Sequence, residues 1–316
     1  MQHVLTQNNS TGHCGFADVP VEVTASTLDF ATHVDAHIKG TETTSVGADE
    51  LLCRIICRFV CRQWRDLLPK PTRKEIKKFG RLISRRGWLT MMKWAMEAGF
   101  PCRIFSCTEA AKGGHVEALI WMRKIGGRWT TTTYAAAASF GNLEMVKWMR
   151  EKGCPYDREA CRSAAREGHL ELLKWLRGES TNKKQSWIRR NWPFWKRRCQ
   201  WDAHTCSAAA LGGHLEVLKW ARENGCSWNQ ATCTRAAEGG HLEVLKWARE
   251  NGCCWDEDTC FKAALGGHLR VLKWARENGC PMDSSAYTGA LKGGHTTVLE
   301  WLSVEQKSFA QSSQEG

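Results

Sequence analysis

Two rows of histidine and cysteine, each at one position of a repeated motif, are the residues of this sequence best suited to chemistry. The histidines recur every 27 residues or at a multiple of that step, with one longer gap, and Asn142 takes their place once. The histidines are His115, His169, His214, His241, His268 and His295, and the cysteines are Cys206, Cys233 and Cys260. Because imidazole and thiolate are preferred zinc ligands, a metal-binding array is the first hypothesis to test.

The spacing of the two rows argues against shared metal ions. Equivalent residues of successive repeats lie on helices packed about 8–10 Å apart, whereas zinc holds its donors at about 2.0–2.3 Å. Three further cysteines, Cys53, Cys57 and Cys61, share one helix face at steps of four, which is not a usual zinc or iron-sulfur spacing. We therefore expect histidines at helix starts, small buried thiols, and neither metal nor other cofactor.

Motifs that carry catalysis are missing from the sequence. There is no Gly-Lys-Ser/Thr phosphate loop, no HExxH, no GxSxG and no calcium loop, and no pair of acids stands apart from the repeat pattern. We predict that the protein is not an enzyme.

The motif that contains the histidines is GGHLEVLKWARENGC. It fills residues 212–226, recurs unchanged at 239–253, and returns at 266–280 with the single change of Arg270 for Glu. Its tryptophan recurs eight times, at intervals of 27 residues apart from one gap of 45: Trp94, Trp121, Trp148, Trp175, Trp220, Trp247, Trp274 and Trp301. Such a period is typical of stacked repeats that bury their apolar faces only against one another.

Each repeat has the pattern of two helices with marked ends. The first helix is alanine-rich and ends at Gly-Gly, and the second is followed by a glycine suited to the left-handed conformation. Capping residues precede the first helices: Thr130, Asp157, Asp202, Asn229, Asp256 and Asp283. On the second helix, Val, Leu, Trp and Ala share one face and the charged residues the other. We therefore predict that the eight tryptophans form the buried core, as a spine through the stack.

The segment GHLEVLKWARENGC resembles the ankyrin repeat motif GHLEVVKLLLEAGA, and the Thr-Cys-x-x-Ala-Ala before it is similar to a degraded form of the ankyrin TPLHxAA. The resemblance covers residues 87–302 and implies an all-α, ankyrin-like solenoid of stacked helix-turn-helix repeats. The period is 27 residues instead of about 33, and both helices are intact. We therefore predict that the missing residues come from the connections, which leaves β-hairpin fingers short or absent.

An amphipathic helix is predicted at residues 49–69. DELLCRI and FVCRQWRDLLP resemble the two ends of the F-box, through which substrate receptors dock onto the Skp1-type adaptor of cullin ubiquitin ligases, although the middle of an F-box is absent. The resemblance implies the following adaptor-binding residues: Leu51, Leu52, Ile55, Val60, Trp64 and Leu67. The alternative is a helix that packs its apolar stripe onto the first repeat.

Two short segments carry the net charge of +12. Residues 70–86 sum to +7 and residues 183–198 to +7, so the rest of the chain is about neutral. We interpret 70–86 as a capping segment for the array, with a nuclear-import or nucleic-acid patch as the alternative.

The second charged segment belongs to an 18-residue lengthening of one repeat, which we place at 179–198. Its basic patch is Lys183, Lys184, Arg189, Arg190, Lys196, Arg197 and Arg198, interleaved with aromatic residues. A tolerated surface loop, an import or docking signal, and single-stranded nucleic-acid binding are the three readings, in decreasing order of preference.

The remaining segments and the cysteine content bear on compartment. Residues 1–48 are polar without a period, which predicts disorder, and 303–316 form a polar tail. Sixteen cysteines without an export signal favour reduced thiols in an intracellular protein of the cytoplasm or nucleus. No apolar run approaches the roughly 18 residues that cross a bilayer, so no membrane association is expected.

Three functions follow from these observations. The first is a non-enzymatic scaffold that binds another protein through its repeats, as ankyrin arrays generally do. The second is a substrate receptor of a Skp1-cullin-F-box ligase, and the third and weakest is nucleic-acid binding through the insertion. We expect partner specificity where copies differ, as at Arg270 against Glu216 and Gln230 against Glu257.

Overall fold

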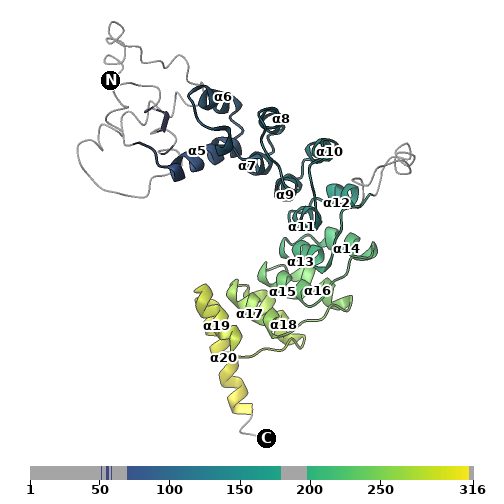
Figure 1. The fold of residues 1–316 in the computed structure, drawn as a ribbon. Coiled ribbons are helices and arrows are strands. Elements are labelled where there is room, and N and C mark those ends of the chain that lie inside the picture. Colours follow the sequence, from purple (N-terminus) through teal and green to yellow (C-terminus); the bar gives the residue numbers. More distant parts are fainter. Residues whose placement is uncertain (1–50, 52–54, 57, 59–69, 179–197, 313–316) are drawn as a thin grey trace, which may run out of the picture. The chain divides into compact units, whose positions relative to one another are not determined.

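The computed structural model of the 316-residue chain describes residues 51, 55–56, 58, 70–178 and 198–312, the last seven as backbone only. The chain divides into two compact units, Met1–Trp129 and Thr130–Gly316, which are treated separately below. Sixteen α-helices, α5 to α20, and one short 3₁₀ helix, η2, lie within 70–178 and 198–312, and these ranges contain no strand (Figure 1).

The first unit contains four of these helices and η2: α5 (Arg73–Arg85), α6 (Leu89–Glu97), η2 (Cys102–Ile104), α7 (Cys107–Lys112) and α8 (Val116–Lys124). α5 begins at a capping box in which the Thr72 hydroxyl accepts from the Glu75 amide and the Glu75 carboxylate accepts from the Thr72 amide. It packs its apolar side, which includes Phe79 and Ile83, against α6, η2 and α7. Most of the basic segment 70–86 therefore forms the helix α5, which packs against α7.

The second unit is a row of six helix pairs. The first helices are α9 (Thr131–Phe140), α11 (Arg158–Arg166), α13 (Ala203–Leu211), α15 (Ala231–Glu238), α17 (Glu257–Leu265) and α19 (Ser285–Gly293). The second helices are α10 (Leu143–Glu151), α12 (Leu170–Arg177), α14 (Leu215–Glu223), α16 (Leu242–Glu250), α18 (Leu269–Glu277) and α20 (Thr296–Ser312). Each first helix packs on the next one along the row, which confirms the predicted stack of helix pairs (Figure 1).

The helix ends follow the sequence signals with one exception. The side chains of Asp157, Asp202, Asn229 and Asp283 each accept a hydrogen bond from a backbone amide two residues on, at 2.9–3.2 Å. Asp256 makes no such bond, and burial raises the pKa of its carboxyl, with Asp258 and Glu257 adding to the effect. The glycines after the second helices are left-handed as predicted, with φ of +81° at Gly225 in one copy.

The fully buried core is made of smaller side chains than we predicted. In one copy Val217, Leu218 and Ala221 are 0–3 % exposed, whereas the tryptophans Trp94, Trp121, Trp148, Trp175, Trp220, Trp247, Trp274 and Trp301 are all only partly buried. The prediction of a buried tryptophan spine was therefore wrong. The close contacts between repeats are made by the alanine-rich first helices, so the large indole of each second helix lies at the edge of the packed region.

Short connections take the place of hairpin fingers. Apart from the one that contains the insertion, the connections before the first helices of this unit span only a few residues, as at 224–230 and 251–256, and these contain no strand. Within the connections a cysteine thiol donates to a carbonyl of the preceding connection: Cys199 to Asp157 at 3.0 Å, Cys226 to Asp202 at 3.3 Å, Cys253 to Asn229 at 3.3 Å and Cys280 to Asp256 at 3.4 Å. A short turn, stabilised by these side-chain hydrogen bonds, therefore takes the place of the β-hairpin finger of an ankyrin repeat.

The last helix, α20, extends farther than the expected end of the array at residue 302. It continues through Ser312, because Gln306 stands where the other repeats carry the glycine that ends the second helix, such as Gly279. The first part of the segment interpreted as a polar tail is therefore helical.

Candidate protein-binding surface

The histidine row is structural, and each described bond joins neighbouring repeats. The Nε2 atoms of His169, His241, His268 and His295 lie 2.9–3.0 Å from the backbone carbonyl oxygen 30 residues earlier, at the end of the preceding first helix. In the first unit, His115 makes the same contact to the Arg85 carbonyl at 3.0 Å. Within the described residues no three His, Cys, Asp or Glu side chains converge as a metal site requires.

The imidazole rings also explain the second glycine of the Gly-Gly pairs at 212–213, 239–240 and 266–267. Gly240 has φ of +77°, and a Cβ built on it would lie 2.5 Å from Nδ1 of His268. The first glycine is equally confined, because a Cβ on Gly239 would lie 2.5 Å from the Leu211 carbonyl oxygen. The motif GGH is therefore a packing unit between repeats.

The cysteine row is buried beside the thiols of the connections. Cys206, Cys233 and Cys260 are 0 % exposed, as predicted for small buried thiols. A hydrogen bond with Cys226, together with burial, raises the pKa of Cys206, and Cys253 acts in the same way on Cys233. Since only the thiolate is a strong nucleophile, Cys206 and Cys233 act as packing groups.

Arginine and tryptophan brace each connection from outside. The Arg222 guanidinium lies 4.2 Å from the Trp228 ring centre and donates to the Cys226 carbonyl at 2.6 Å, and Trp228 meets Trp247 edge to face at 5.7 Å. The same arrangement occurs one repeat earlier and one repeat later in this unit. The half-exposed tryptophans thus stiffen the short turns through cation–π and aromatic contacts.

Some of the exposed positions that differ between repeats lie on the first helices. From α15 to α17 three such positions carry different residues, whereas the buried Cys and Ala-Ala positions are unchanged. In α15 and α17 these positions are Thr234, Arg235, Glu238, Phe261, Lys262 and Leu265, all partly exposed, and we call them the first-helix surface. The sequence already indicates this surface, because the aligned repeats differ at these positions. The residues that we predicted to give specificity, such as Arg270 and Gln230, lie at other positions of the repeat.

Charges and an aromatic ring share the first-helix surface. Glu238 accepts from Arg235 of its own helix and from Lys262 of the next at 3.2 Å. Burial alone would raise the pKa of Glu238, but the bonds from Arg235 and Lys262 outweigh it and lower the pKa, so the carboxylate stays ionised at neutral pH. Phe261 lies close to Gly289 of α19, where a Cβ would be 3.0 Å from the ring.

Two large hydrophobic residues are exposed on α19, at positions that are buried in α17. Tyr287 is 37 % and Leu291 is 55 % exposed, and they lie four residues apart on α19. The equivalent positions of α17, Cys260 and Ala264, are 0 % exposed. Sequence reasoning missed this pair because the repeat pattern predicts buried residues at both positions.

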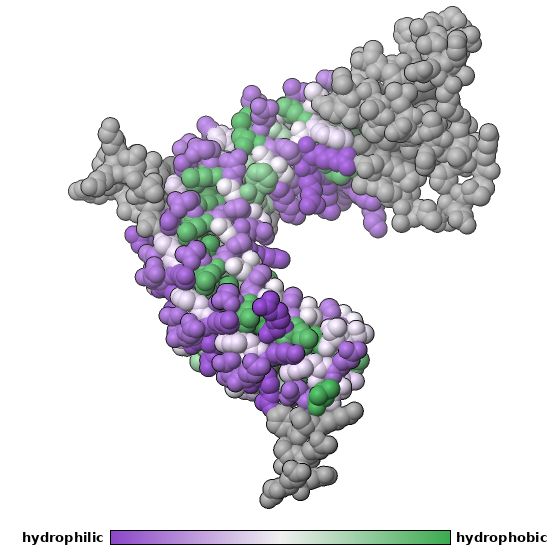
Figure 2. All heavy atoms as spheres, turned by 180° about the vertical axis from the view of Figure 1, so that it is seen from behind, coloured by the Kyte–Doolittle hydropathy of each residue, from purple (hydrophilic) through white to green (hydrophobic). Residues whose placement is uncertain are grey.

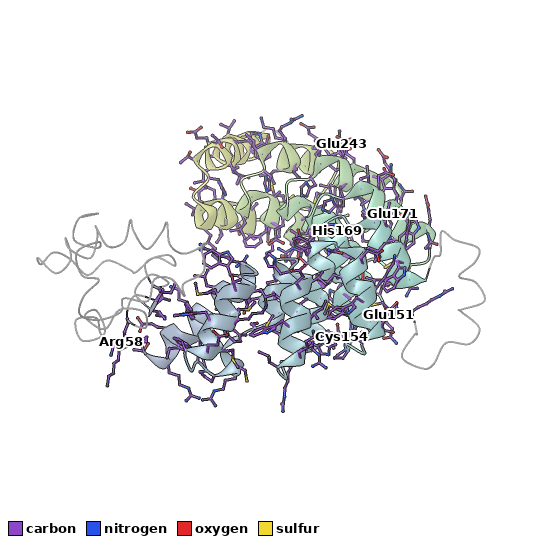
Figure 3. All side chains as sticks on the ribbon, turned by 90° about the horizontal axis from the view of Figure 1, so that it is seen from above. Arg58, Glu151, Cys154, His169, Glu171 and Glu243 are labelled. Carbon is purple, nitrogen blue, oxygen red and sulfur yellow. The ribbon has the colours of Figure 1, made fainter. Side chains whose placement is uncertain are left out.

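One of the residues expected to give specificity, Arg270, lines a separate hollow. Glu243 and Arg270 flank a shallow hollow of about 360 Å³ between the starts of α14, α16 and α18. Glu216 and Glu243 pair with Lys219 and Lys246 on their own helices at 2.9 and 3.1 Å, and Arg270 cannot repeat that pairing. Figure 3 shows Glu171 and Glu243 pointing outward from their helices. Gln230 and Glu257 are exposed at the starts of first helices.

The other candidate residues are only partly within the described chain. Leu51 and Ile55 are helical and 1–2 % exposed, so the chain itself covers two of the six residues assigned to an adaptor. Leu52, Val60, Trp64 and Leu67 lie outside the described residues, as do Cys53, Cys57 and Cys61, residues 1–48, and the insertion up to 197. Of the basic patch only Arg198 is described, and it is exposed.

Comparison with known proteins gives one match. Residues 134–177 match a family model described as ankyrin repeats (many copies). No match to this chain is found among the curated proteins. Together with the row of helix pairs, the match supports an all-α, ankyrin-like solenoid for the repeat array. Ankyrin repeats are generally protein-interaction modules, and no helix in the described part of the chain is long and apolar enough to cross a membrane.

Proposed function

We propose that the protein is a non-enzymatic scaffold that binds another protein through the first-helix surface and the adjoining pair Tyr287 and Leu291. The observation that carries this proposal is the contrast within each repeat. From α15 to α17 the buried Cys and Ala-Ala residues are the same, whereas the partly exposed Thr234, Arg235 and Glu238 are replaced by Phe261, Lys262 and Leu265. Differences between copies at exposed positions are what recognition of a particular partner needs.

The composition of the surface suits a protein partner. Aromatic and arginine side chains are enriched at protein interfaces, and this surface contains Phe261 of α17 and the ion-paired Arg235 of α15, with Tyr287 on α19. On the face shown in Figure 2, hydrophobic residues lie in small groups between hydrophilic ones. An interface on such a surface would combine a few apolar anchors with a polar rim.

The proposal is tested by comparing partners of the full chain with those of a double variant, Tyr287→Ala with Leu291→Ala. Both residues are exposed, so the fold should survive, and proteins captured by the parent chain should be lost. Val304→Ala, at a 65 % exposed position on α20, is the matched control. Equal capture by all three proteins, or no enrichment over an unrelated repeat array, would rule out this surface.

An adaptor role remains the second candidate, because residues 49–68 resemble the ends of an F-box. The burial of Leu51 and Ile55 favours a helix that packs within its own chain. Co-purification of the full chain with a Skp1-type adaptor decides the question. If no adaptor accompanies the intact protein, the ligase role is excluded and the scaffold role is unaffected. Nucleic-acid binding by the insertion is weaker still, since the proposal rests on composition alone.

A further inference from the structure

One side of α5 is a dense row of cations. Lys74, Lys77, Lys78, Arg81 and Arg85 are all exposed, and we call them the basic face. Projected at 100° per residue they fall within an arc of about 100°. The opposite side of the helix is the buried one that holds Phe79 and Ile83, so the orientation of the basic face is set by packing.

No acidic side chain in the described chain neutralises this face. Glu75, the one acid of α5, caps its own helix, accepting from the Thr72 amide at 2.7 Å and hydroxyl at 2.9 Å. Among the ion pairs of the described residues, none includes a member of the basic face. Residues 70–129 contain fourteen basic and four acidic residues, a net charge of +10 out of +12 for the whole chain.

Four partly exposed lysines of the second unit are ion-paired instead. Lys147, Lys174, Lys219 and Lys246 each pair with a glutamate three residues earlier, at 2.6–3.1 Å. Exposed cations without such partners raise the local potential and attract polyanions. The basic face is therefore suited to an anionic partner.

The surroundings of the basic face favour one class of polyanion. The exposed large hydrophobic residues of the described chain are Phe140, Tyr287, Leu291 and Val304, and all four lie outside residues 70–129. A protein partner would need apolar anchors at the centre of its interface, and a membrane-inserting helix needs a free apolar side, which α5 has buried. Phosphodiester backbones are bound by cations alone.

We propose that the basic face of α5 binds the phosphate backbone of a nucleic acid without reading its sequence. From Lys74 to Arg85 the helix rises about 17 Å, which matches the rise of about five nucleotides of one strand at 3.4 Å each. If all five cations reach phosphates, the slope of log K against log salt for a duplex is about −4.5, so binding weakens on the order of 500-fold between 50 and 200 mM salt.

The experiment measures binding of the full chain to a labelled 20-base-pair DNA duplex of arbitrary sequence by fluorescence anisotropy over that salt range. The test variant replaces Lys74, Lys77, Lys78 and Arg81 with Gln, which should reduce the slope to about −0.9 and the salt effect to roughly 3- to 4-fold. A matched variant replaces the paired Lys147, Lys174, Lys219 and Lys246 with Gln and should bind as the parent does. Both have the same loss of charge, and circular dichroism checks that both are folded.

Two further variants keep the test decisive. Exchange of Lys74, Lys77 and Lys78 for Arg preserves the charge and should preserve binding even if the Gln variant is poorly folded. Exchange of Lys183, Lys184, Arg189 and Arg190 for Gln leaves α5 intact and should leave most of the binding. The proposal is overturned if the parent does not bind at 50 mM salt, if the insertion variant alone abolishes binding, or if polyglutamate or anionic vesicles bind as tightly as the duplex.

Discussion

The contact between each histidine and the Gly-Gly loop of the preceding repeat predicts that two similar glycines respond very differently to alanine. Gly240 and Gly252 are both left-handed, with φ of +77° and +82°. A Cβ on Gly240 would lie 2.5 Å from the His268 ring, whereas a Cβ on Gly252 would meet nothing within 4 Å. The comparison therefore separates backbone strain from loss of packing between repeats.

The expected magnitudes follow from the structure. Gly252→Ala should cost only the left-handed strain, about 1–2 kcal/mol. Gly240→Ala carries the same strain and also displaces the His268 ring, whose Nε2 lies 3.0 Å from the Glu238 carbonyl oxygen. Loss of that hydrogen bond adds about 0.5–1.5 kcal/mol, so Gly240→Ala should lose about 1.5–3.5 kcal/mol in all.

The assay is urea unfolding of the full chain, followed by circular dichroism, with hydrogen exchange to locate the loss at residues 239–268. A double-mutant cycle adds His268→Ala, which removes the ring that alanine at 240 would strike. In that background Gly240→Ala should cost no more than Gly252→Ala. Equal losses for the two glycine variants in the parent chain, or no relief from His268→Ala, would refute the reasoning.

Three other predictions concern single contacts. Burial lowers the pKa of His241, and the neighbouring His214 and His268 lower it further. The contribution of His241 to stability should therefore be complete above its unfolded pKa of about 6.5 and decline as the pH falls through that value. The thermal midpoint of His241→Asn should change less between pH 8 and 5 than that of the parent chain, and an equal change would contradict the prediction. Arg249→Met should lower the free energy of unfolding, measured in urea, by about 1–3 kcal/mol, because it removes the contact with Trp255 and the hydrogen bond to the Cys253 carbonyl. An unchanged free energy of unfolding would show that these contacts do not stabilise the fold. Thr72→Ala should cost about 1 kcal/mol and speed amide exchange at the start of α5, whereas unchanged exchange counts against the cap.

The sequence was sufficient for the architecture because its signals agree with one another. The period, the capping residues and the glycine stops each define the same two helices, and the structure has both within about one residue of the predicted ends. A helical projection shows which side of Leu215–Glu223 is apolar, but it does not show how closely neighbouring second helices approach. The exposure of Trp220 follows from that approach, and so it could not be predicted from the repeat alone.

The candidate surface was predictable only in part, for a related reason. The differences at Thr234 and Phe261 are visible in the aligned copies, whereas the repeat pattern predicts buried residues at the positions of Tyr287 and Leu291. The repeated GGH motif shows that the histidines are equivalent, but it does not show which carbonyl oxygens they contact. That His241 reaches back to the Leu211 carbonyl is a property of two stacked repeats, and no single repeat contains it.

A repeat of 27 residues can be stable without a β-hairpin finger because side chains link neighbouring repeats at two places, the end of the first helix and the connection. At one edge His241 and His268 reach the end of the preceding first helix, as His268 reaches the Glu238 carbonyl. At the connection edge each repeat in the run 203–280 has a thiol that donates to the preceding connection, as Cys253 does to Asn229, with Arg249 bracing the turn. The unchanged letters GGH and ENGC are therefore those that join neighbours. This leaves the first helices as the place where residues can vary without loosening the stack, which is why a partner should be recognised there.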